Sequence, residues 1–292
     1  MTISATIVKD SVGPNGVRLT TFVLKFHRFV LSEFNTHRMF SRNASSSRAI
    51  PIEKQIKMIE EDCAMPLEFR KNQKGMQAGD ALDEQNQQLA KLEWIKARDL
   101  AIQQAKELIK LGVHKQYVNR LLEPFSHISV IVSATEYSNF FALRHHSMAQ
   151  PEIAELARQM WELYKNNVPI KLYPGEWHLP FVTDEEIKDY FSHGWLPLIK
   201  KSVARCARVS YLNHEGKEST FEQDCALYDR LLKENPKHSS PAEHQAQVWA
   251  WFGDPPADPK AISHFSGNFR GWNQYRQMIP GQNITKFEGP LG

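Results

Sequence analysis

Residues 19–34 alternate apolar with polar positions and are rich in β-branched and aromatic side chains, in the run LTTFVLKFHRFVLSEF. This pattern is typical of half-buried strands and predicts one or two of them. Ser, Asn and Arg dominate residues 35–47, which follow directly. We expect an ordered loop there, because Arg and His are too frequent for a flexible Gly/Ser spacer. Pro51 then limits any helix that would run across it.

Apolar residues recur at helical spacing in several later segments. Residues 84–111 predict a long amphipathic helix, and residues 151–164 and 221–232 predict two more. A shorter helical pattern covers residues 54–59. The residues expected on the buried faces are Leu89, Leu92, Ile95, Ile102, Ala105 and Ile109 in the longest helix and Ile153, Leu156, Ala157 and Met160 in the second.

The remaining segments set the expected organisation of the chain. Residues 70–83 are polar and contain glycine, which predicts a loop, and the run QVWAWF at 247–252 predicts a strand. A length of 292 residues allows one large domain or two modest ones. We expect residues 1–165 to form a first segment and the proline-containing residues 166–203 to connect it to residues 204–292, which fold with it as one unit.

Composition excludes several classes of protein. Lys and Arg number 36 against 33 Asp and Glu, a weaker basic excess than nucleic-acid polymers usually attract. The three cysteines, Cys63, Cys206 and Cys225, form neither a disulfide framework nor a Cys-x-x-Cys zinc motif. The chain starts without a signal-peptide pattern and has no apolar run of about 18 residues, so we expect a cytoplasmic protein without membrane contact.

Residues 36–48 (THRMFSRNASSSR) carry the strongest chemical signal. Guanidinium groups and hydroxyls are good ligands for phosphates, and here they are dense after a predicted strand. On composition alone, a solvated Ser-rich turn explains the run about equally well, because short motifs often match by chance.

The order of these residues favours the first interpretation. The stretch resembles the signature of flavin-dependent thymidylate synthases, R-H-R-x-x-S-x-N-x-x-S-x-R, at six of its seven fixed positions. The chain departs from the family pattern at Thr36, where the first Arg is expected, at Ala44 in place of Glu and at Ala49 in place of Tyr. The matching residues are His37, Arg38, Ser41, Asn43, Ser46 and Arg48.

Two further blocks resemble the same family. The segment GVHKQYVNRLLEP at 112–124 places Arg120 on an Arg that contacts the nucleotide in the family. NFFALR at 139–144 and AQPEI at 149–153 resemble N-F-x-x-L-R and A-Q-x-E-I. Taken alone, the second block is also explained by the start of a helix, where an acidic residue favours the helix dipole.

A third block is displaced along the chain. ARVSY at 207–211 and HSSPAEH at 238–244 resemble A-R-V-S-Y and H-x-S-P-F-E-H, which precede the signature in the family but follow it here. The order looks circularly permuted, which compact domains tolerate because their termini often lie close together. Residues 269–276 (FRGWNQYR) faintly echo the family's R-Q-W-x-R-H-R segment, so Arg270 or Arg276 is a candidate to replace the Arg missing at position 36. A C-terminal packing segment explains them equally well.

The resemblance implies an α+β fold, a twisted antiparallel sheet flanked by helices, assembled as a homotetramer with sites shared between subunits. It also implies FAD as cofactor, methylenetetrahydrofolate and NADPH as co-substrates, and dUMP, a pyrimidine deoxynucleotide monophosphate, as the acceptor that becomes dTMP. The protein then positions and tunes groups while the cofactor supplies the difficult chemistry. No Rossmann-type glycine fingerprint is present, so FAD is expected to bind without one.

The same resemblance assigns roles to individual residues. Ser46 and Arg48 are expected to hold the nucleotide phosphate with help from Arg120. Arg144 is expected to meet the pyrimidine edge and to favour negative charge on it, and Gln150 to support Arg144. Of these, Arg144 and Ser46 are the expected catalytic residues together with His238, which is placed near flavin and folate. The residues expected to line FAD are His37, Arg38, Ser41, Asn43, Asn139, Ser210 and Ser240.

Several alternatives stay open. Glu33 stands where the family has Gln, and a carboxylate there would accept a hydrogen bond from the amino group of cytosine. The acceptor could then be dCMP, or the product a hydroxymethyl pyrimidine, and a non-catalytic nucleotide-binding protein is a second alternative. Cys206 is a poor candidate nucleophile, because nothing beside it resembles the classical thymidylate synthase site. Adjacent His145 and His146 point in different directions, so no metal is expected.

Overall fold

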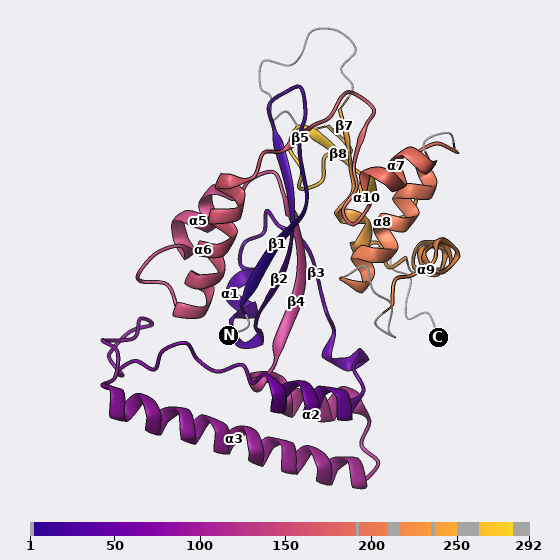
Figure 1. Ribbon diagram of the computed structural model, residues 1–292. Coiled ribbons are helices and arrows are strands. Elements are labelled where there is room, and N and C mark those ends of the chain that lie inside the picture. Colours follow the sequence, from indigo (N-terminus) through magenta and orange to yellow (C-terminus); the bar gives the residue numbers. More distant parts are fainter. Residues whose placement is uncertain (1–2, 191–192, 210–216, 235–236, 250–262, 283–292) are drawn as a thin grey trace.

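The computed structural model describes residues 3–190, 193–209, 217–234, 237–249 and 263–282. At its centre is a five-stranded sheet with the order β3-β4-β2-β1-β5 (Figure 1). All neighbouring strands are antiparallel except β5, which pairs parallel with β1. The strands are β1 (Ser4–Val12), β2 (Arg18–His27), β3 (Ser41–Ala44), β4 (His127–Ala134) and β5 (Ile170–Lys171).

One face of the sheet is covered by α5 (Ser138–Arg144) and α6 (Pro151–Asn166) (Figure 1). Alternate residues of β2 and β4 pack against these helices in the largest apolar cluster, because successive strand residues point to opposite faces. The predicted buried face of the helix at 151–164 is confirmed. The sheet residues at the centre of this cluster are Phe22, Leu24, Phe26, Val130 and Val132.

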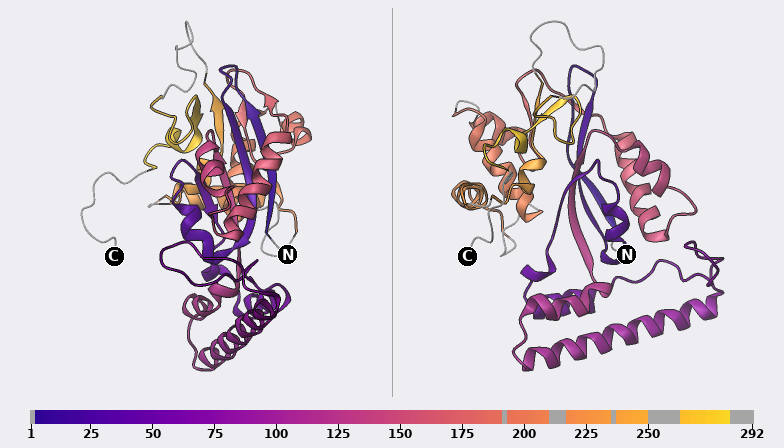
Figure 2. Two further views of the ribbon diagram at one scale, coloured as in Figure 1. Left: turned by 90° about the vertical axis from the view of Figure 1, so that its left-hand side faces the viewer. Right: turned by 180° about the vertical axis from the view of Figure 1, so that it is seen from behind.

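A smaller three-stranded sheet and four helices lie against the other side of the central sheet (Figure 2). The small sheet has the order β6-β7-β8, and α8 packs beside α9. These elements are β6 (Trp177–His178), α7 (Asp184–Tyr190), α8 (Leu196–Arg208), α9 (Phe221–Lys233), β7 (Ala246–Val248), β8 (Trp272–Gln274) and α10 (Tyr275–Met278).

A third group of helices crosses one end of the sheet: α2 (Ile52–Glu61), α3 (Glu84–Lys110) and α4 (Lys115–Leu122) (Figure 1). The long predicted helix is confirmed as α3, but its predicted buried face is wrong in the N-terminal half. Leu89 and Leu92 are 52% and 54% exposed, whereas Ile102 and Ala105 are buried. The difference arises because the buried residues of α2 and α4 pack against the C-terminal half of α3.

The antiparallel-rich sheet flanked by helices confirms the expected α+β fold. The short helix at 54–59, the loop at 70–83 and the helix at 221–232 are also confirmed. Of the one or two strands predicted within 19–34, one forms as β2, and α1 (Leu31–Asn35) follows it and buries Phe34.

Two further segments differ in detail from the predictions. Residues 166–203, expected as a connection, contain β5, β6, α7 and most of α8. Within 247–252, β7 accounts for the first two residues, and 250–252 lie outside the described residues. Among the residues that the structure describes, no helix is both long and apolar enough to cross a membrane.

Candidate functional site

The signature-like residues 36–48 run from the end of α1 through a turn into β3 and then into the short 3₁₀ helix η2 (Ser47–Ala49). Because β3 pairs with β4 at the edge of the central sheet, the signature is fixed in register, with Ser41 opposite Ser133. The candidate residues fall into three clusters along this path: one before β3, one on β3 and one after it.

The first cluster joins the signature to the end of α5. The Arg144 guanidinium donates from Nε to His37 Nε2 at 3.0 Å and from Nη2 to Thr36 Oγ1 at 3.3 Å. His37 is buried against Phe40 and Phe140. Thr36, the residue that departs from the family's first Arg, therefore contacts Arg144 directly.

The electrostatics of this cluster keep His37 neutral. Burial, and then the positive charges of Arg144 and Arg42, lower the pKa of His37 to about 4. A neutral imidazole that accepts at Nε2 carries its proton on Nδ1. The pair therefore presents one cation, the partly exposed Arg144, beside a ring that adds no charge.

The second cluster brings the displaced HSSPAEH block against β3. Asn43 lies within 3.2 Å of both Ser240 Oγ and His244 Nε2. Ser41 Oγ, on the same strand, accepts from Gln274 Nε2 at 3.0 Å. Residues 197 to 233 positions apart thus meet on one edge strand. His238 is exposed, and its backbone N donates to Leu231 O at 2.8 Å.

The third cluster holds the turn that contains Ser46 and Arg48. Both of these side chains are exposed, while Ser47 between them is buried. Asn119, fully buried on α4, donates to the backbone carbonyls of Ser47 at 2.7 Å and Ile50 at 3.0 Å. The turn is therefore fastened to α4.

Glu123 joins this turn to Arg120. Its carboxylate accepts from Ser47 Oγ at 2.6 Å and from Arg120 Nη1 at 2.9 Å. The Arg120 side chain is 58% exposed. Arg48 on the turn and Arg120 on the helix that fastens the turn are therefore both exposed, and exposed guanidinium groups suit an anion such as a phosphate.

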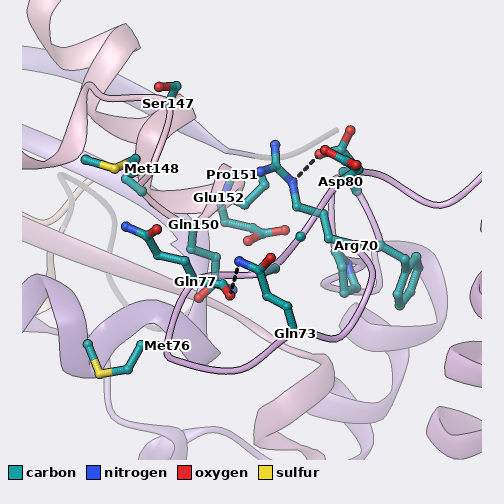
Figure 3. Close-up of a pocket in the computed structure, with 16 residues that line it drawn as sticks. Arg70, Gln73, Met76, Gln77, Asp80, Ser147, Met148, Gln150, Pro151 and Glu152 are labelled. Atoms are coloured by element: carbon teal, nitrogen blue, oxygen red, sulfur yellow. Dashed lines mark hydrogen bonds and ion pairs between the residues drawn. The ribbon is translucent and has the colours of Figure 1, made fainter.

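Gln150 lines a cavity of about 590 Å³ between the loop at 66–80 and the start of α6 (Figure 3). Arg70, Gln73 and Asp80 line it from the loop side. Among the described residues, no hydrogen bond joins Arg144 to Gln150.

Glu152, two positions after Gln150, was open to interpretation as a helix-dipole residue. It is almost fully buried, and its Oε1 accepts from the backbone N of Leu67 at 2.7 Å. Glu152 therefore also fixes the loop that closes one side of the cavity.

Other candidates lie on the surface around the clusters. Arg38 and Asn139 are exposed, and the partly exposed Glu33 accepts from Ser32 Oγ at 2.7 Å. Ser210 lies outside the described residues; Val209 before it ends α8 with a left-handed φ of 58°.

The C-terminal segment that echoes the family lies beside the second cluster. Gln274 reaches Ser41, and Arg276 forms an ion pair with Glu243 of the HSSPAEH block. Arg270 is exposed. Sequence reasoning did not select Gln274, Glu243 or Asn119 as functional residues. Glu243 and Asn119 stand within blocks that resemble the family, and this placement was the signal that could have identified them.

The side chains around the second cluster suit a flavin nucleotide by their chemistry. The partly exposed amide of Asn43 and the exposed hydroxyl of Ser240 offer donors and acceptors for ring edges, and Arg38, elsewhere on the signature, has an exposed guanidinium for phosphates. These residues fit FAD, which in this chain would bind without a glycine-rich loop.

Comparison with known proteins identifies the family. A sequence profile described as "Thymidylate synthase complementing protein" matches residues 17–170, more than half of the chain. The protein belongs to this family, and the resemblance to flavin-dependent thymidylate synthases is confirmed. A search of curated proteins gave no match.

Two solved structures of PolB, a UMP/dUMP methylase from Streptomyces cacaoi, are similar to part of the chain. The complex with 5-Br UMP is 16% identical, covers 56% of this chain and 88% of its own, and has a TM-score of 0.45. The complex with 5-Br dUMP is 15% identical, covers 56% and 90%, and has a TM-score of 0.44.

Proposed function

We propose that this protein transfers a one-carbon unit from methylenetetrahydrofolate to C5 of dUMP and forms dTMP, with FAD as cofactor and NADPH as reductant. Membership of a generally flavin-dependent family supports the proposal. The observation that carries it is the contact between Arg144 and His37, which links the signature to the NFFALR block at a polar surface.

Arg144 is proposed to meet the edge of the pyrimidine. A positioned guanidinium stabilises negative charge on the ring, which makes C5 nucleophilic towards the one-carbon unit. Such electrostatic stabilisation acts only if the cation is held in place. His37 and Thr36 hold two guanidinium nitrogens on one side, which leaves the remainder of the group for a ligand.

Ser46, Arg48 and Arg120 are proposed to bind the phosphate of the nucleotide. The turn carrying Ser46 and Arg48 is rigid, because Asn119 and Glu123 tie its buried side to α4 and its neighbour. A phosphate bound there would gain charge-assisted hydrogen bonds without further ordering of the backbone.

Asn43 and Ser240 are proposed to contact FAD, with His37, Arg38, Ser41, Asn139 and Ser210 lining the same site. When bound, FAD supplies reducing equivalents. His238, exposed at the start of the HSSPAEH block, is proposed to lie near flavin and folate, and Gln150 to contact substrate from the cavity in Figure 3. We further propose a cytoplasmic homotetramer.

Product mass tests the reaction. The FAD-loaded protein is incubated with methylenetetrahydrofolate, NADPH and equal dUMP and dCMP, and the nucleotides are weighed. A methyl gain on dUMP is expected. A gain on dCMP, or a hydroxymethyl gain, would replace the proposed reaction while keeping the family. FAD binding without any gain would favour a non-catalytic nucleotide-binding protein, and no FAD binding would refute the flavoenzyme.

Arg144→Ala tests the central contact. We expect kcat/KM to fall by about 10²- to 10³-fold, the usual effect of losing one electrostatic group at a reacting centre, with FAD still bound. Arg158→Ala is the matched control, since Arg158 is a surface arginine paired only with Glu155 among described residues. Equal activity of the two variants would remove Arg144 from the mechanism.

A further inference from the structure

A continuous line of polar side chains crosses the buried face of the central sheet and ends at Asn43. We call it the polar relay. Every member except Asn43 is fully buried. Its members, in order, are Ser11, His178, Thr21, Ser133, His244 and Asn43.

Strand register builds the inner half of the relay. Thr21 on β2 is the direct cross-strand partner of Ser133 on β4, and their hydroxyl oxygens are 2.6 Å apart. His178 of β6 bridges outward from Thr21 Oγ1, 2.8 Å from its Nε2, to Ser11 Oγ, 3.0 Å from its Nδ1. Each of these links is short enough for a well-formed hydrogen bond.

The outer half reaches the candidate flavin surface. Ser133 Oγ is 2.9 Å from His244 Nδ1, and His244 Nε2 is 3.2 Å from the Asn43 amide. One amide orientation satisfies both polar atoms of Asn43. In it, Nδ2 donates to the Ser240 carbonyl at 3.0 Å and to His244 Nε2 at 3.2 Å, and Oδ1 accepts from Ser240 Oγ at 3.2 Å.

Both histidines of the relay are neutral, because burial lowers the pKa of His244 to about 3 and that of His178 well below its usual value. A neutral imidazole has one donor and one acceptor nitrogen. A hydroxyl that accepts a hydrogen bond from one neighbour donates its own hydrogen bond to the other neighbour. The direction of every link therefore follows from the direction of one.

We propose that the polar relay fixes the amide orientation of Asn43, with His244 and His178 as positioning residues, and so selects the hydrogen-bonding group that the site presents beside Ser240. In the orientation described, both histidines carry their proton on Nδ1. The functional half of this proposal rests on the proposed flavin site; the coupling between the two histidines does not.

Asn43→Asp tests the coupling. A carboxylate only accepts, so His244 must donate from Nε2, and each link behind it reverses until His178 also carries its proton on Nε2. Nitrogen-15 NMR of labelled histidines at pH 8 reads both tautomers directly. We expect both rings to change together. A changed tautomer of His244 together with an unchanged tautomer of His178 would overturn the relay. Residue 43 would then influence only the histidine that it contacts.

Thr21→Val tests the functional role without touching Asn43. It removes one hydroxyl at nearly constant volume, and Thr20→Val is the matched control, because Thr20 is equally buried on the same strand but bonds to Asp10. We expect Thr21→Val to weaken FAD binding roughly 3- to 10-fold, the worth of about one hydrogen bond, and Thr20→Val to leave it unchanged.

The outcomes separate the two proposals. Equal loss of FAD affinity in both variants would show that the relay supports the fold and does not position Asn43. Unchanged affinity in Thr21→Val would overturn its role in positioning. Failure of the wild-type protein to bind FAD would refute the flavin site, while the NMR measurement would still decide whether the histidines are coupled.

Discussion

Asn119 offers the sharpest test of how the proposed phosphate-binding turn is held. Its side chain is fully buried on α4 and donates to the carbonyls of Ser47 and Ile50, on either side of Arg48. The other amide atom, Oδ1, is buried without a hydrogen-bond partner among the described residues. The residue therefore acts on the turn through its donor nitrogen alone.

The magnitude follows from these contacts. Asn119→Ala leaves the buried Ser47 carbonyl without a donor, at about 1–3 kcal/mol, and loses the partly buried bond to Ile50, at about 1 kcal/mol. Removal of the orphaned Oδ1 returns about 1 kcal/mol. We expect a net loss of about 1–3 kcal/mol, which a domain stable by roughly 5–15 kcal/mol survives.

Asn119→Asp should be worse than Asn119→Ala, although it is nearly isosteric. The carboxylate replaces the donor by an acceptor and places it against the two carbonyls, with a desolvation cost that alanine avoids. Urea denaturation gives the stabilities, and calorimetric titration with dUMP gives the affinity. Both variants should bind dUMP more weakly than wild type. An aspartate variant as stable as the alanine variant would refute the donor role.

Three further predictions rest on the other clusters. The depressed pKa of His37 means that its contribution to stability is full above about pH 6.5 and is lost as the pH falls towards 4. Arg144→Ala should raise this pKa, which NMR titration measures; an unchanged value would show that the charge of Arg144 does not contribute to it. Cys206 is fully buried, which strongly raises the pKa of its thiol, so Cys206→Ala should keep full turnover, and a strong loss would reinstate a covalent mechanism. Inactive Arg144→Ala and Arg48→Ala chains, refolded together, should regain activity if subunits share sites; no recovery would indicate sites within one chain.

Periodicity predicted the helices well because their signal is local. In α6 the apolar residues at 153, 156, 157 and 160 all lie in the core, as spacing requires. The same logic failed for Leu89 and Leu92, since spacing identifies an apolar face but does not say whether another element covers it. Coverage depends on where α2 and α4 pack, which is a tertiary property.

Strands were harder to predict. The run HISVIVSA of β4 is covered on both faces, so its apolar residues do not alternate with exposed polar ones. Within 19–34, aromatic composition favoured a strand throughout, but the chain turns after His27 and buries Phe34 from a helix. Composition alone does not mark that turn.

The sequence supplied the candidate residues, whose roles remain predictions, but it did not supply their grouping. The order of the signature identified His37 and Asn43, and the blocks identified Arg144 and Ser240. Which of them touch depends on contacts over 107 and 197 positions, which no local pattern encodes. Asn119 and His244 were not predicted for the same reason, because each acts by holding another residue in place through a hydrogen bond.

Both faces of the central sheet carry apolar contacts, but the face away from α5 and α6 adds a row of buried polar side chains. This added row explains how a displaced motif reaches its place. The face under α5 and α6 is apolar, and apolar packing tolerates small shifts. On the other face Thr21, Ser133 and Ser41 stand in register across three strands and meet His178, His244 and Gln274. Buried polar groups lose free energy unless each finds its partner, so one docking position is strongly preferred. We infer that this polar seam, more than the covalent order of the chain, sets Ser240 against Asn43.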